Sequence, residues 1–219
     1  MAIFEWCSGQ FRPQVVPSSQ TSNPGKARKS RMDQPYAFRT LPDYLGAGLK
    51  LVLVGINPGQ FSVDRGHYFA RPQNRFWPAF SASKLSEPIR RALGARVLVP
   101  EHDRLLPRFG IGLTDIIKRP TKNASELTAA EFEEWVPRLV EKLMFYAPGV
   151  VCFHGVTGYV PFARIVFGRA ARTPLGEQVD RLGETPLYVV PNPSPANAHC
   201  RLGQQTTWYD HLAEFVTTH

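Results

Sequence analysis

The chain has 219 residues, of which 43% are hydrophobic, and its formal net charge is +8. This length suits one domain with a tail, and no apolar run approaches the ~20 residues that a membrane-spanning helix needs. The first residues lack the basic and long apolar regions of a signal peptide, so we expect an intracellular protein. The charge favours a polyanionic partner such as nucleic acid, and a basic surface without a partner is the alternative.

Residues 1–40 differ in composition from the rest of the chain. Prolines mix with Ser, Gln and Asn without any periodicity, and four basic residues gather at Lys26, Arg28, Lys29 and Arg31. This composition is typical of a flexible, solvated arm, which could also touch phosphates. We therefore predict a basic N-terminal arm over 1–40 and one globular domain over 41–219.

Strands and helices alternate along the globular part. Apolar runs predict buried strands at 49–56, 150–153 and 187–190, and an apolar segment with one carboxylate lies at 110–117. A loop is expected over 58–73, longer than packing requires, which indicates a functional role. Helices are expected near 74–80, 87–93, 101–109, 128–147, 156–167 and 204–217. The alternation predicts an α/β fold with a parallel sheet covered by helices on both faces.

Two Asn-Pro sequences follow predicted strands. The sequence GINPG, with Asn57 at its centre, follows the first strand, and PNPS, with Asn192, follows the last. Ligands of open α/β sheets bind at the carboxyl ends of the strands, so the two loops can converge on one crevice. Because an amide offers both donors and an acceptor, we expect Asn57 to face the molecule that the protein handles.

Three motifs occur in a meaningful order: GINPG at 55–59, YFARPQNRFW at 68–77 and PNPS at 191–194. Together they resemble the mismatch-specific uracil-DNA glycosylase and thymine-DNA glycosylase group of the uracil-DNA glycosylase superfamily, over roughly 41–215. The resemblance implies a three-layer α/β/α sandwich around a short, mostly parallel sheet. It also implies a monofunctional glycosylase for uracil, and for thymine or related modified pyrimidines, mispaired with guanine in double-stranded DNA. Such an enzyme flips the target nucleotide into a pocket.

The resemblance assigns roles to single residues. Asn57 matches the catalytic asparagine, whose amide oxygen would aim a water at the anomeric carbon; otherwise it only closes its turn. Phe69 matches the aromatic residue on which the flipped base stacks; otherwise it is an ordinary core residue. The backbones of Ile56, Tyr68 and Phe69 would read the pyrimidine edge, and Ser62 would lie near its 5-substituent.

The loop after the last strand would carry two further roles. Asn192 takes the place of a histidine found in another branch of the superfamily and would donate to the base or the departing anion. Asn74 and Arg75 are expected only to fix the loop that carries them. The wedge that fills the gap in the duplex, with its DNA contacts, is predicted at Ser194, Pro195, Ala196, Asn197 and Arg201.

Two features depart from the family's pattern. Small Ala196 and Ala198 replace the wedge leucine and the arginine after it, with His199 nearby, which puts mismatch selectivity in question. Asp115 lies where the group usually carries Lys or Asn, among apolar neighbours that require the carboxylate to be paired, exposed in a cleft or raised in pKa.

The role of Asp115 has several possible readings. We hypothesise that it activates the water or stabilises the cationic sugar. The alternatives are a strand-end cap or a salt bridge with Lys118 or Arg119, and Asp64 is a second candidate for assisting the water.

No metal ligand spacing is found among the cysteines and histidines, and the hydrolysis needs no metal or cofactor. The expected partner is duplex DNA, bound by a monomer, with phosphate contacts from basic residues around the crevice: Arg65, Arg71, Lys118, Arg119, Lys122 and Arg201. The alternatives are a DNA-lesion-binding module that has lost catalysis and a Rossmann-like nucleotide enzyme. The latter is disfavoured because GINPG is not GxGxxG.

Overall fold

The computed structural model describes residues 2–7, 10–15, 36–168 and 174–219. The elements follow in chain order: β1 (Ala2–Cys7), β2 (Gln10–Val15), β3 (Leu51–Gly55), α2 (Gln60–Arg65), α3 (Phe76–Ala82), η1 (Lys84–Ser86), α4 (Glu87–Leu93), η2 (Pro100–Phe109), β4 (Ile111–Asp115), η3 (Ala124–Glu126), α5 (Ala129–Tyr146), β5 (Val150–His154), α6 (Val156–Phe167), β6 (Gly176–Leu182), β7 (Thr185–Val190) and α7 (Leu202–Thr218).

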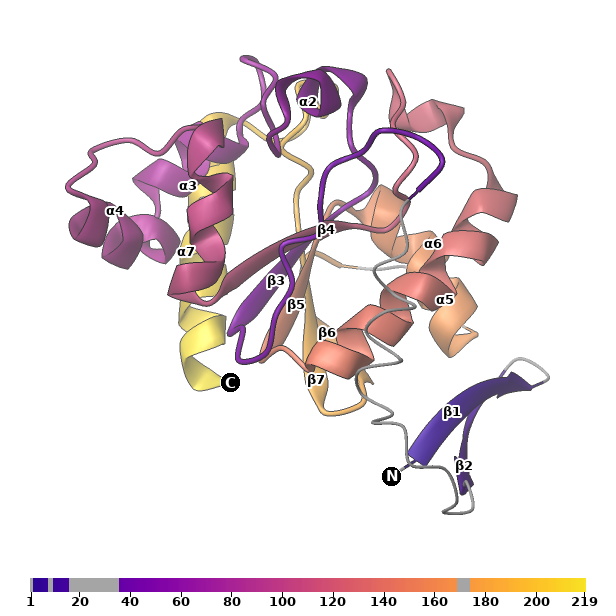
Figure 1. The fold of residues 1–219 in the computed structure, drawn as a ribbon. Coiled ribbons are helices and arrows are strands. Elements are labelled where there is room, and N and C mark those ends of the chain that lie inside the picture. Colours follow the sequence, from indigo (N-terminus) through magenta and orange to yellow (C-terminus); the bar gives the residue numbers. More distant parts are fainter. Residues whose placement is uncertain (1, 8–9, 16–35, 169–173) are drawn as a thin grey trace.

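A five-stranded sheet forms the centre of the fold, with the strand order β4-β3-β5-β7-β6. The first four strands in this order are parallel, and β6 pairs antiparallel with β7 at one edge. Helices α3, α4 and α7 lie on one side of the sheet, and α5 and α6 lie on the other (Figure 1). The predicted α/β fold, with a mostly parallel sheet between two helical layers, is confirmed.

The core consists of two apolar clusters, one on each face of the sheet. Leu51 and Leu53 of β3 pack in the cluster that contains Phe76 of α3 and Tyr209 of α7. Val52 and the other intervening residues of the strands pack in the second cluster, with α5 and α6. Successive side chains of a strand point to opposite faces, so strands covered on both sides must be apolar throughout.

The chain order of the strands creates a switch point beside β3. The connection from β3 leads to β4 on one side, and the chain then returns past β3 to β5 on the other side. The loops that leave the carboxyl ends of these strands therefore diverge and leave a crevice between them. This crevice is where both Asn-Pro loops were predicted to meet.

Helix α5, whose N-cap is Thr128, was recognised correctly from its capping box. The Glu131 N–H donates to Thr128 Oγ1 at 3.3 Å, and the Thr128 N–H donates to Glu131 Oε2 at 2.9 Å. These reciprocal bonds satisfy two donors that the first turn of α5 cannot satisfy itself. The described residues include no helix long and apolar enough to span a bilayer.

Three segments differ from the expectation. The predicted loop 58–73 contains α2, which ends at Gly66 with φ 75°. Strand β6 was missed because it is a polar edge strand, in which Val179 is 90% exposed. Strands β1 and β2 pair with each other, although no regular structure was expected before residue 41. The basic cluster at 26–31 lies outside the described residues.

Candidate active site

A cleft of about 1120 Å³ opens at the carboxyl ends of β3, β4, β5 and β7. Asn57 and Phe69 share this cleft, as the predicted mechanism requires. Every residue predicted to react, to bind the base or to form the wedge and its DNA contacts lines it except Arg201, which is the exposed N-cap of α7. The predicted residues in the lining are Ile56, Asn57, Ser62, Tyr68, Phe69, Asp115, Asn192, Ser194, Pro195, Ala196 and Asn197.

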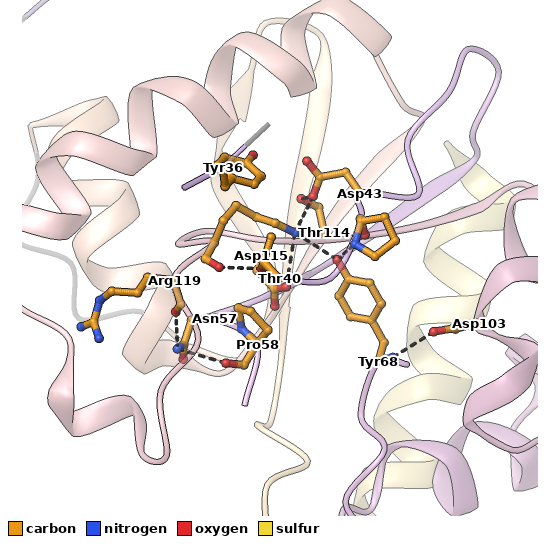
Figure 2. A network of polar contacts seen from close by, with 12 residues as sticks. Tyr36, Thr40, Asp43, Asn57, Pro58, Tyr68, Asp103, Thr114, Asp115 and Arg119 are labelled. Atoms are coloured by element: carbon orange, nitrogen blue, oxygen red, sulfur yellow. Dashed lines mark hydrogen bonds and ion pairs between the residues drawn. The ribbon is translucent and has the colours of Figure 1, made fainter. Parts of the chain in front are cut away.

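The amide of Asn57 is held in one orientation. Its Nδ2 donates to the backbone carbonyl of Arg119 at 3.0 Å and to the carbonyl of Pro58 at 3.3 Å (Figure 2). It also donates to Thr121 Oγ1 at 2.8 Å. Backbone carbonyls only accept hydrogen bonds, so the nitrogen must face them. The oxygen Oδ1 is therefore the end of the amide that is left for a molecule in the cleft.

The segment that anchors Asn57 is itself fixed by an ion pair. Arg119 Nε donates to Glu131 Oε1 at 2.5 Å and Arg119 Nη2 donates to Glu131 Oε2 at 3.1 Å. The hydrogen bond from Arg119 is the main reason that the pKa of Glu131 falls to about 2. Arg119, which we predicted as a phosphate contact, thus places its carbonyl behind Asn57.

Asp115 is a buried carboxylate at the end of β4, in register with Gly55 of β3. A Cβ on residue 55 would lie only 2.3 Å from Asp115 Oδ1, so the first glycine of GINPG leaves room for this carboxylate. Oδ2 accepts no hydrogen bond from the described residues, and the nearest cation, Lys118 Nζ, is 3.7 Å away. Burial raises the pKa of Asp115 to about 6, and the Lys118 ammonium opposes part of that rise.

Asp64, the second candidate for assisting the water, is placed elsewhere. Its side chain is exposed on α2, where Oδ1 accepts a hydrogen bond from Gln60 at 3.0 Å. It does not line the cleft. Among the described residues, Asp115 is the carboxylate that lines the cleft.

Phe69 has a strained backbone and a supported ring. Its φ of 55° is unusual for a residue other than glycine, and such strain is typical of functional positions. Its ring stacks on Phe76 with centroids 4.1 Å apart and planes inclined by 20°. The N–H of Ala70, the residue after Phe69, donates a hydrogen bond to Ser62 Oγ at 3.1 Å. Ser62 thus helps to hold Phe69 in the conformation that presents its ring to the cleft.

The backbone of Tyr68 is engaged inside the protein. Its N–H donates to Asp103 Oδ2 at 2.9 Å, and its carbonyl accepts from Trp77 Nε1 at 2.9 Å. The Tyr68 N–H therefore already has a partner inside the protein, and the reading of a pyrimidine edge by the backbones of Ile56, Tyr68 and Phe69 stays a prediction. The side chain of Tyr68 contributes to the electrostatic environment of Asp115.

Asn192 is held in the opposite sense to Asn57. Its Oδ1 accepts a hydrogen bond from the Ser194 N–H at 2.9 Å. Its Nδ2 is the end that remains for the cleft, which Asn192 lines. Two asparagines on neighbouring loops thus present an acceptor and a donor to the same space.

The loop at 193–197 is tied to the loop that carries Phe69. Arg75 Nη2 donates to the carbonyls of Ser194 at 2.6 Å and Asn197 at 2.7 Å, and the Arg75 N–H donates to the Pro193 carbonyl at 3.0 Å. Asn74 Oδ1 accepts from the Phe76 N–H at 2.9 Å. These contacts agree with the loop-fixing role predicted for Asn74 and Arg75.

Replacing Arg75 by Met should weaken the binding of duplex DNA without changing the chemical step. The variant loses two charge-assisted hydrogen bonds that position the loop, so we expect about tenfold weaker binding. Fluorescence anisotropy measures the affinity, and single-turnover kinetics at saturating protein measures the maximal rate. Arg138→Met, which removes an exposed arginine of α5, is the control for lost charge. Equal effects of the two substitutions would contradict the assignment.

Other residues of the cleft were not singled out from the sequence. Thr121, an anchor of Asn57, lies in a segment without periodicity and gave no signal. His154 was interpreted as a structural histidine. Its Nε2 lies 3.1 Å from Tyr209 Oη, and burial lowers its pKa to about 3.

Lys118 was expected to contact phosphate, but its exposed fraction is 2%, so it cannot reach a phosphate. The described residues contain no cluster of acidic, His or Cys side chains suited to a metal.

A family model and a solved structure both match this chain. The family described as the Uracil DNA glycosylase superfamily matches residues 42–214, which cover the sheet and most of α7. The solution NMR structure of a Methanosarcina acetivorans protein, provisionally assigned as a uracil DNA glycosylase, matches at 21% sequence identity with a TM-score of 0.48. That match covers 82% of this chain and 98% of the other chain.

Proposed function

Because the chain belongs to the uracil DNA glycosylase superfamily, we propose that it hydrolyses the N-glycosidic bond of uracil mispaired with guanine in duplex DNA. The observation that carries this proposal is the cleft that Asn57 and Phe69 both line, with the Asn57 Nδ2 held by the Arg119 carbonyl so that Oδ1 is left for a bound molecule. Thymine and related modified pyrimidines are further candidate substrates. The chain would act as a monomeric, monofunctional enzyme.

The target nucleotide must leave the base stack before its glycosidic bond can be reached. In the cleft, the flipped base would stack on Phe69, whose other neighbour, Phe76, keeps the ring in place. Stacking of one base on an aromatic ring contributes about 1–3 kcal/mol and tolerates different bases. Ser62 would lie near the pyrimidine and influence which 5-substituents fit.

Water would attack the anomeric carbon while the bond to the base breaks. Asn57 Oδ1 accepts a hydrogen bond from this water and fixes its position, since an amide is too weak a base to remove the proton. Asp115 is ionised near neutral pH, and its carboxylate can take the proton as the new C–O bond forms. Its charge also favours the cationic character that develops on the sugar.

The base would leave with the electron pair of the broken bond. Asn192 Nδ2 can donate a hydrogen bond to the resulting pyrimidine anion, because Oδ1 of the same amide is occupied by the Ser194 N–H. A donor placed where negative charge develops lowers the barrier more than one that only binds the substrate. The products are an abasic sugar and the free base.

Ala196 is the feature that would broaden the accepted duplexes. It is exposed at the tip of the loop that is predicted to fill the gap in the helix. We expect Ala196→Leu to raise the preference for G·U over A·U by about tenfold, because the larger side chain contacts the opposite base. Single-turnover excision from the two duplexes gives the ratio. An unchanged ratio would show that residue 196 does not meet the opposite strand.

A labelled duplex with one G·U pair tests the proposed function. Hydrolysis predicts an alkali-labile abasic strand together with free uracil. Tight binding without product would favour the alternative, a lesion-binding module, and neither binding nor product would exclude both. The A·U duplex and the single strand, assayed in parallel, define how far the mispair matters.

A further inference from the structure

A buried charge cluster lies directly behind Asp115. Asp43, in the segment before β3, accepts hydrogen bonds from Lys118 Nζ at 2.8 Å and Thr114 Oγ1 at 2.7 Å through Oδ1. Its Oδ2 accepts from Lys142 Nζ at 2.5 Å. Figure 2 shows Asp43, Thr114 and Asp115 gathered on one side of Asn57, next to the ring of Tyr68. The cluster thus runs from Asp115 through Lys118 and Asp43 to Lys142 of α5.

The two lysines differ in their relation to Asp115. Lys118 Nζ lies 3.7 Å from Asp115 Oδ2 and donates to Tyr68 Oη at 3.3 Å. Lys142 Nζ donates instead to Tyr36 Oη at 3.0 Å and to Asp43, on the far side of that carboxylate. Of the two lysines, Lys118 is therefore the one within ion-pair distance of Asp115.

The charges of this cluster balance only when Asp115 is ionised. Lys118 and Lys142 supply two positive charges, and Asp43, whose pKa falls to about 2 despite burial, supplies one negative charge. One positive charge is left over inside the protein, where an uncompensated charge is costly. The carboxylate of Asp115 is the group that can neutralise it.

We propose that Lys118 is a positioning residue for the reaction, which keeps the Asp115 carboxyl charged near neutral pH. This role rests on the proposed function and goes beyond it, because Lys118 has no access to the cleft and cannot touch the substrate. Tyr68 supports it: its hydroxyl accepts from Lys118 and donates to the Pro42 carbonyl at 3.0 Å.

The charged and titratable groups that face Asp115 come from several elements. Lys118 follows β4, Asp43 comes from the N-terminal segment, and Tyr68 comes from the loop before α3. His154 of β5 lines the same cleft and stays neutral because burial lowers its pKa to about 3. Among these, Lys118 is the cation that favours the ionised form of Asp115, and Asp43 opposes it.

The test is the pH dependence of single-turnover uracil excision by Lys118→Met. Loss of a cation within about 4 Å should raise the midpoint of the acid limb by one to three pH units, with recovery of much of the rate at high pH. A merely structural role would lower the rate at every pH and leave the midpoint in place. Tyr68→Phe, which keeps the ring, should raise the midpoint by a smaller amount.

Lys142→Met is the matched control. It removes a buried ammonium from the same cluster, but from the side of Asp43 that is remote from Asp115. Its acid limb should stay close to that of the wild type. Equal shifts in the two lysine variants, or no shift in Lys118→Met and Tyr68→Phe, would overturn the proposal.

A carboxyl titration followed by NMR separates this proposal from the proposed function. With ¹³C-labelled aspartate, the midpoint of Asp115 should rise in Lys118→Met even if the protein excises no base. A raised midpoint without any excision would overturn the proposed function alone. An unchanged midpoint in a folded variant would overturn the role of Lys118 alone.

Discussion

Asp115→Asn is expected to lower uracil excision near neutral pH by about 100- to 10,000-fold, the range over which general-base catalysis contributes. The substitution keeps the shape of the side chain but removes the group that takes the proton from water. It also removes the negative charge beside the forming sugar cation. Single-turnover kinetics with a G·U duplex measures the loss.

Asp115→Asn should have a higher free energy of unfolding than the wild type near neutral pH. The folded state holds the proton of Asp115 up to about pH 6, whereas an ordinary aspartate releases it near 3.8. The folded protein therefore binds more protons between these values, and its free energy of unfolding falls as the pH rises through this window. Above this window, the free energy of unfolding of the wild type is lower by about 3 kcal/mol. Asp115→Asn has no carboxyl group at this position and does not show this loss.

Urea unfolding of the wild type and the variant at a series of pH values tests this expectation. The difference in unfolding free energy should grow in favour of Asp115→Asn from about pH 4 to pH 6 and then stay constant. A difference that is independent of pH would show that Asp115 titrates normally. An excision rate that survives the substitution would remove Asp115 from the mechanism, whatever its pKa.

Asn57→Ala is expected to lower the maximal excision rate by about 100- to 1,000-fold, with little change in DNA affinity. The amide oxygen acts on the attacking water and not on the binding of the duplex. Thr121→Val, which removes one of the hydrogen bonds that hold Asn57 Nδ2, should lose about tenfold. Larger damage from Thr121→Val than from Asn57→Ala would contradict the positioning role.

Much of the site could be predicted because its residues lie in short motifs at strand ends. Asn57 and Asn192 follow apolar strands directly, so an α/β fold was enough to bring them to one crevice. Asp115 attracted attention as a charge in an apolar segment. In each case a short stretch of sequence indicated the residue, and its place at the end of a strand indicated that it lies near the others.

The supporting contacts could not be predicted, because they join distant segments without any pattern. Asp43 reaches Lys142 from 99 positions away, and nothing near either residue indicates the pair. Lys118 looked like a surface cation because lysine is almost never buried without a partner, and its hydrogen-bond partner Asp43 lies 75 positions away. The use of the Tyr68 N–H by Asp103 was hidden for the same reason.

A crystal structure with a non-cleavable substrate would test the central claim most directly. The duplex would carry one G·U pair whose uridine has a 2′-fluorine, which suppresses the cationic transition state and preserves the bond. We predict that the uracil is out of the helix, stacked on Phe69, with its anomeric carbon facing Asn57 Oδ1 and Asp115. A uracil that remains paired in the helix, or that binds away from these three residues, would contradict the account.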